Sequence, residues 1–270
     1  MDLSPASVGP PRIGAGRALF AATIFIVSVS ALANRDLAAI WQPVPRQWPA
    51  QGALVWATGL VSAGCGLGLL WRRAVPFAAG ILAGAFLVWM LAIKVPVIVR
   101  SPTMAAAWES CGETVVLVAA AWALFAELGA GWRGLGLLVG ARGLRLARRL
   151  YALAMLAFGA AHLAYVKETA ALVPAWLPGH VAWVWLTGLA YIAAGVAILT
   201  GVFARLAAAL SAAQMGAFTL LVWAPVVASG HAAAADWSEA VISWTLTVGG
   251  CVIAGAYRDT AWLAVRGRPR

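Results

Sequence analysis

Eight long apolar stretches follow one another along the chain, separated by short segments that are polar or rich in proline. They lie at about 18–33, 53–71, 74–97, 107–128, 151–167, 181–200, 204–225 and 239–257. Each approaches the roughly 20 residues that an α-helix needs to cross the hydrocarbon core of a bilayer. The pattern predicts an all-α membrane protein with eight transmembrane helices, the first of which stays in the mature chain.

The pattern also repeats itself, with an offset of 129 residues. Trp56-Ala57-Thr58-Gly59-Leu60 matches Trp185-Leu186-Thr187-Gly188-Leu189, and the same offset pairs Pro49 with Pro178, Gly66 with Gly195, Pro96 with Pro225 and Trp108 with Trp237. A fixed period of this length indicates duplication. An even number of spans per copy directs both copies the same way across the membrane. We therefore expect two parallel-repeat four-helix bundles.

The expected boundaries follow from the repeat. A cytoplasmic N-terminal tail covers 1–16, the first unit 17–128, a basic cytoplasmic linker 129–150, the second unit 151–258 and a basic cytoplasmic tail 259–270. A composition of 63% hydrophobic and 10% charged residues agrees with a chain whose main partner is the lipid bilayer.

Basic residues predict the orientation, because Lys and Arg are retained on the cytoplasmic side. One set of helix ends carries Arg12, Arg17, Arg72, Arg73, Arg133, Arg142, Arg145, Arg148, Arg149, Arg205, Arg258, Arg266, Arg268 and Arg270. The other carries only Arg35, Arg46, Arg100 and Lys167. Both termini are therefore expected in the cytoplasm, in a cell inner or plasma membrane. The net charge of +10 does not indicate nucleic-acid binding, since the basic residues are not interleaved with aromatic ones on one surface.

Acidic residues have the opposite bias, so we expect the polar chemistry at the outer ends of the spans. Ionisable groups within spans are costly and indicate function. Lys94 and Glu113 are expected at similar depth in antiparallel neighbours, where they could pair, and Glu109 shares a helical face with Glu113. The alternative is that Lys94 extends to the interface and Glu109 caps its helix.

His162 is the third candidate for catalysis, beside Lys94 and Glu113. Histidine titrates near neutral pH and suits proton transfer or hydrogen bonding to a ligand. A helix-packing hydrogen bond is an equally good interpretation. The first unit has no histidine in the corresponding stretch, so we expect a site that is single or asymmetric.

Two external segments, 41–49 and 173–180, are rich in tryptophan and proline. They could form lids over a ligand cavity, although an interfacial tryptophan belt would explain them as well. The candidate ligand-binding residues at the outer ends are Trp108, Glu109, Trp176, Trp237 and Glu239.

A metal site is not expected. Cys65, Cys111 and Cys251 are too far apart in the sequence for a CxxC pair or a zinc site, and no spacing typical of a haem or flavin site is present.

The repeated pattern resembles the DoxX/DoxD-like membrane proteins. In the second unit the resemblance rests on His162, Pro174, Pro178, Thr187, Gly188, Gly195, Arg205 and Pro225. In the first it rests on Pro45, Pro49, Thr58, Gly59, Gly66, Arg73 and Pro96, without the histidine.

The resemblance implies a four-helix fold for each unit and a quinone-linked membrane component of an oxidoreductase system, with a redox partner protein. In that case Lys94 and His162 would donate to the quinone carbonyls and Glu113 would pass protons to the outer face. The alternative is a non-enzymatic membrane scaffold, or a protein that binds or transports a small ligand.

Overall fold

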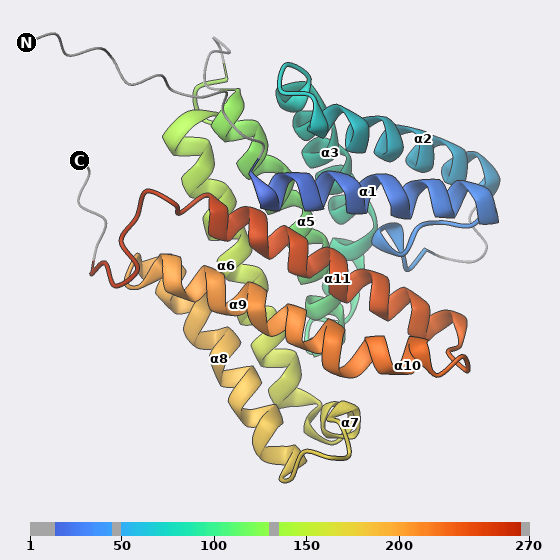
Figure 1. Ribbon diagram of the computed structural model, residues 1–270, viewed down its shortest axis with the longest axis vertical. Coiled ribbons are helices and arrows are strands. Elements are labelled where there is room, and N and C mark those ends of the chain that lie inside the picture. The colour runs from blue at the N-terminus through green and yellow to red at the C-terminus, as the bar shows by residue number, and fades with distance from the viewer. Residues whose placement is uncertain (1–13, 45–49, 130–134, 266–270) are drawn as a thin grey trace, which may run out of the picture.

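The computed structural model describes residues 14–44, 50–129 and 135–265, and their regular structure is helical (Figure 1). The α-helices are α1 (Ala15–Asn34), α2 (Gln51–Leu70), α3 (Val75–Trp89), α4 (Val95–Arg100), α5 (Ala105–Leu128), α6 (Gly140–Ala164), α7 (Val166–Leu172), α8 (His180–Thr200), α9 (Ala204–Phe218), α10 (Ala224–Ala228) and α11 (Ala234–Gly255). A 3-10 turn covers Ala39–Trp41, and π-helical segments cover Met90–Lys94 and Thr219–Trp223.

The prediction of a multi-span helical protein is confirmed. Seven helical spans are long and apolar enough to cross a membrane, and an eighth forms if α6 and α7 count as one span bent by 96°. This indicates a multi-pass membrane protein.

Helix α6 starts earlier than the apolar stretch that we expected at about 151–167. Helix α6 begins at Gly140, inside the segment that we expected to be a linker. Gly143 and Ala147 are buried on one face, whereas Arg142 and Arg145 are exposed on another. The basic segment therefore forms the amphipathic first part of α6. A search for continuous apolar residues does not detect such a helix.

The third and seventh spans continue past the prolines at which we expected them to end. Each has a π-helical segment that ends two residues before a proline, Pro96 or Pro225, and then a short helix, α4 or α10. Proline lacks an N–H group and crowds the carbonyl one turn earlier. The wider π-turn accommodates it without ending the span.

Helix α5 lies at the centre of the protein. In its most apolar 18-residue stretch 72% of the residues are buried, against 39% or fewer in the other six spans of that length. It packs against α3, α6 and α11, while α1 packs against α2 and α11 (Figure 1). The first helix of each expected unit thus contacts the last helix of the other, because α1 meets α11 and α6 meets α5.

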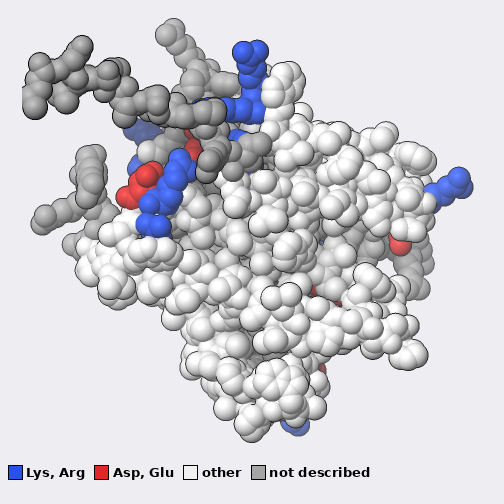
Figure 2. All heavy atoms as spheres, viewed as in Figure 1, with Lys and Arg blue, Asp and Glu red and all other residues white. Residues whose placement is uncertain are grey.

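The charged residues lie mainly at the two ends of the spans. Figure 2 shows most of the visible charged side chains at the upper left of the view, while the middle of this face is almost free of charge. We call the end that contains Arg17, Arg72 and Arg258 the basic end. The opposite end, with Asp36 and Glu239, is called the acidic end.

Glycines allow close helix contacts, among them those at Gly66 and Gly195. A Cβ atom on Gly66 of α2 would lie 2.8 Å from the backbone nitrogen of Phe25 on α1. A Cβ atom on Gly195 of α8 would lie 2.8 Å from the carbonyl oxygen of Ala152 on α6. Gly64 is an exception, because nothing lies within 4 Å of the Cβ position there.

We expect Gly66→Ala to lower the free energy of unfolding by about 1–3 kcal/mol, because the added methyl group forces α1 and α2 apart. Gly64→Ala, on the exposed side of the same helix, is the matched control and should leave stability unchanged or slightly raised. Thermal unfolding of the purified protein in detergent checks this. Equal effects at both positions would contradict the close contact.

Candidate functional site

A cavity of about 860 Å³ lies at the acidic end, where α5, α7, α11 and the segment after α1 meet. Its polar and aromatic lining comprises Asp36, Gln42, Glu109, Ser110, Glu113, Tyr165, Glu168, Thr169, Trp223, Ser238 and Glu239. We call this cavity the acidic chamber. Its carboxylates come from three helices and one loop, so tertiary packing alone brings them together.

The five carboxylates of the chamber occupy different depths. Asp36, Glu168 and Glu239 are exposed at the rim, whereas Glu109 and Glu113 are half-buried on α5. The spacing of four residues places Glu109 and Glu113 on one face of the helix, as expected. No Lys or Arg is among the described residues that line the chamber. The wall is therefore strongly acidic.

A smaller cavity of about 150 Å³ shares Glu109, Glu113 and Glu239 with the chamber and extends to His162. We call it the inner pocket. The imidazole Nδ1 is 2.9 Å from the carbonyl oxygen of Phe158, while Nε2 is buried without a hydrogen-bond partner. The ring of His162 is edge-on to those of Tyr191 and Phe218, with centroids 5.4 and 5.6 Å away.

Lys94 lies next to the chamber and does not line it. Its side chain is only 4% exposed, so the alternative in which it extends to the interface is wrong. The ammonium group donates to the carbonyl oxygen of Gln42 at 2.7 Å and to Ser110 Oγ at 2.8 Å. Among the described residues, direct ion pairs involve only Arg258, so Lys94 and Glu113 are not in direct contact as a pair.

The tryptophans that we expected to bind ligand lie elsewhere. Trp108, Trp176 and Trp237 are 47%, 69% and 52% exposed and do not line the chamber. Exposed positions of this kind agree with the alternative of an interfacial tryptophan belt. In the first lid segment, residues 45–49 lie outside the described residues. Trp41, before them, is buried and stacks on Phe86 with centroids 4.6 Å apart.

Several residues that line the two cavities were not among the predicted site residues. Asp36, Glu168 and Trp223 line the chamber, and Tyr191 lines the inner pocket. The concentration of acidic residues at one set of helix ends was a usable signal for Asp36 and Glu168. No sequence signal distinguished Trp223 and Tyr191 from the many other aromatic residues of the spans.

Within the described ranges, no group of three His, Cys, Asp or Glu side chains is arranged to hold a metal ion. The three cysteines are free, and none is paired with another.

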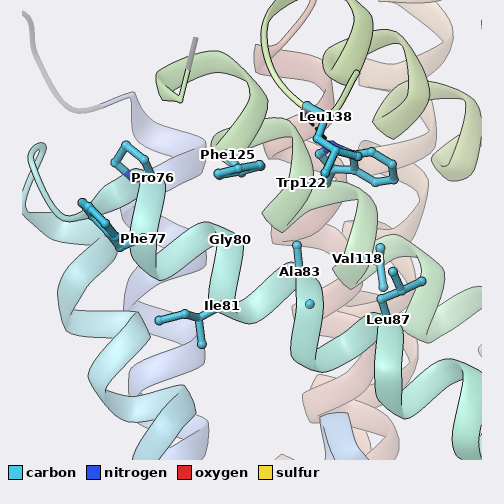
Figure 3. Close-up of a pocket in the computed structure, with 11 residues that line it drawn as sticks. Pro76, Phe77, Gly80, Ile81, Ala83, Leu87, Val118, Trp122, Phe125 and Leu138 are labelled. Carbon is cyan, nitrogen blue, oxygen red and sulfur yellow. Dashed lines mark hydrogen bonds between the residues drawn. The ribbon is translucent and has the colours of Figure 1, made fainter. Parts of the chain in front are cut away.

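A groove of about 470 Å³ lies between α3 and α5 and, unlike the two cavities described above, has no charged residue in its described lining (Figure 3). Its lining is apolar and includes Phe77, Ile81, Leu87 and Phe125. Among the described lining residues, Trp122 has the one polar side-chain atom, and its indole N–H donates to the carbonyl oxygen of Leu138 at 2.8 Å. A groove of this kind suits lipid chains and offers no group for chemistry.

Comparisons of this chain with protein-family models, with curated proteins and with solved structures find no match.

We expect Lys94→Met to lower the free energy of unfolding by about 1–3 kcal/mol, because it removes the donor to the part-buried oxygens of Gln42 and Ser110. Lys167→Met, which changes an exposed lysine at the same end, is the control and should have little effect. Thermal unfolding of both variants measures the difference. Unchanged stability of Lys94→Met would contradict a structural role for these two hydrogen bonds.

Proposed function

We propose that this chain is a two-unit, DoxX-like membrane protein that binds a small cationic ligand in the acidic chamber. Both termini would lie in the cytoplasm of a cell inner or plasma membrane, so that the chamber opens on the outer face. The observation that carries the proposal is the set of five carboxylates around a cavity whose described lining has no Lys or Arg.

Helix boundaries support the two units. At the offset of 129 residues, α3 coincides with α9, and the π-helical segment Met90–Lys94 coincides with Thr219–Trp223. The start of α2 coincides with that of α8, and the start of α5 with that of α11. An irregular feature such as a π-helical segment, repeated at the same offset as the sequence, favours duplication.

The lining of the chamber supports a single site shared by both units. Six pairs of residues separated by the same offset line it, and four of them include a polar residue: Asp36 and Tyr165, Glu109 and Ser238, Ser110 and Glu239, and Glu113 and Ile242. Positions that duplication makes equivalent thus face each other across one cavity. The pseudo-two-fold axis would pass through the chamber.

The size and charge of the chamber favour a small cation. A volume of about 860 Å³ is within the range of small-molecule sites, roughly 300–1,000 Å³. Half-buried carboxylates that lie close together repel one another and lose hydration. A ligand with a positive charge would offset both costs, while the aromatic ring of Trp223 could contact its apolar part.

The test is calorimetric titration of the full chain with choline and tetramethylammonium. We expect saturable binding that weakens about tenfold or more in a Glu109→Gln, Glu239→Gln double variant, because two carboxylates that face the cation are neutralised. Asp236→Asn is the matched control: it removes a charge from α11 outside the chamber, where the carboxylate accepts from the Ala233 N–H group.

Binding of either cation that is lost in the double variant and kept in Asp236→Asn supports the proposal. Absence of binding to the folded wild-type protein, or equal binding by the double variant, would reject a cation site in the chamber.

The inner pocket favours a second candidate, the quinone-linked redox role. His162 Nε2 is buried without a partner, beside the rings of Phe158, Tyr191 and Phe218. Because Nδ1 donates to the carbonyl oxygen of Phe158, Nε2 of the neutral imidazole is an acceptor, so the ring of a reduced quinone could stack there and donate its hydroxyl group to Nε2. Lys94 would not contact this quinone directly, since its ammonium group is bound to Gln42 and Ser110.

Extraction of quinones from protein purified from native membranes tests this candidate. We expect quinone to remain with the wild type and with His231→Leu, which changes an exposed histidine, and to fall about tenfold in His162→Leu, because a buried hydrogen bond is lost. Equal recovery from His162→Leu, or no quinone in the wild type, would contradict the redox role.

A further inference from the structure

A third polar cavity lies at the basic end, far along the spans from the acidic chamber. Its volume is about 640 Å³, and it lies among the start of α1, the turn after α2 and the ends of α5 and α11. Three arginines line it, Arg17, Arg72 and Arg258, together with one acidic residue, Glu127. We call it the arginine cavity.

The charges in the arginine cavity are not balanced. Glu127 forms an ion pair with Arg258, and among the described lining residues no other carboxylate faces Arg17 and Arg72. Arg17 Nε is buried and has no hydrogen-bond partner. A buried donor without a partner is costly unless a ligand accepts from it. The unpaired donor and the excess positive charge both indicate an anion.

The start of α1 also favours an anion in the arginine cavity. Gly14 caps this 20-residue helix without a side-chain hydrogen bond, and its first turn contains no acidic residue. Gly14 and Gly16 both line the cavity, so the backbone N–H groups of the first turn adjoin it. These groups and the helix dipole favour a negative charge at this point.

We propose that the arginine cavity binds the phosphate group of an anionic phospholipid from the leaflet at the basic end. Arginine presents its N–H groups in a fork that fits phosphate oxygens. Basic pockets between helices on this side of membrane proteins bind lipid head groups. The apolar lining from Leu124, Leu128 and Val252 would contact the first part of the acyl chains.

The experiment uses the full chain in nanodiscs of phosphatidylcholine that contain a small fraction of phosphatidylglycerol, followed by native mass spectrometry to count retained lipids. We expect wild type to retain phosphatidylglycerol in preference to phosphatidylcholine. Arg17→Gln and Arg72→Gln should each weaken this preference about fivefold. Arg73→Gln is the matched control, since Arg73 adjoins Arg72 in the same turn and does not line the cavity.

Loss of the preference in both lining variants, with Arg73→Gln like wild type, supports the site. Arg72→Lys, which keeps the charge, should restore much of the preference and shows that any loss does not come from misfolding. Equal retention of the two lipids by wild type, or unchanged preference in Arg17→Gln and Arg72→Gln, would overturn the proposal.

A free phosphate ion has the same chemistry as the head group, so a further arm separates the two. Wild type in pure phosphatidylcholine nanodiscs is titrated with sodium phosphate. Saturable binding that Arg72→Gln abolishes, without any preference for phosphatidylglycerol, would overturn the lipid as the source and assign the site to soluble phosphate.

Discussion

The constraint on which this structure depends is that backbone N–H and C=O groups have no water to bind inside a bilayer. Spans must therefore stay helical, and irregular backbone is tolerated only against protein or a cavity. The described interruptions follow this rule. The π-helical segments end at Lys94 and Trp223, next to or in the wall of the acidic chamber, and the bend after α6 places Tyr165 in the same wall. The constraint thus places the polar site where the helices are broken.

The spans could be predicted from the sequence because hydropathy is a local property of about 20 residues. Their ends could not be predicted equally well. The start of α6 was missed since its arginines interrupt the apolar pattern, although Gly143 and Ala147 are buried by packing. The continuation past Pro96 and Pro225 was missed because a π-turn is a response of the backbone to proline, and hydropathy does not report it.

Part of the site could also be predicted, because the positions of the spans set the depth of each residue in the membrane. Residues at the same ends of neighbouring spans must lie at similar depth, and Glu109, Glu113 and Glu239 do line one pocket. Which side chains then contact each other depends on which helices are neighbours. Lys94 donates to Gln42 and Ser110 because the segment after α1 folds under the chamber, and no periodicity in the sequence predicts that loop.

If the two halves of the chain arose by duplication, as proposed above, lining positions that match at the offset of 129 residues would face each other across one chamber. Identical carboxylates at such positions would repel. The observed pairs avoid this: Glu109 is matched by Ser238, Glu239 by Ser110, and Glu113 by Ile242. A single chain with two halves permits this difference, which two identical subunits could not have.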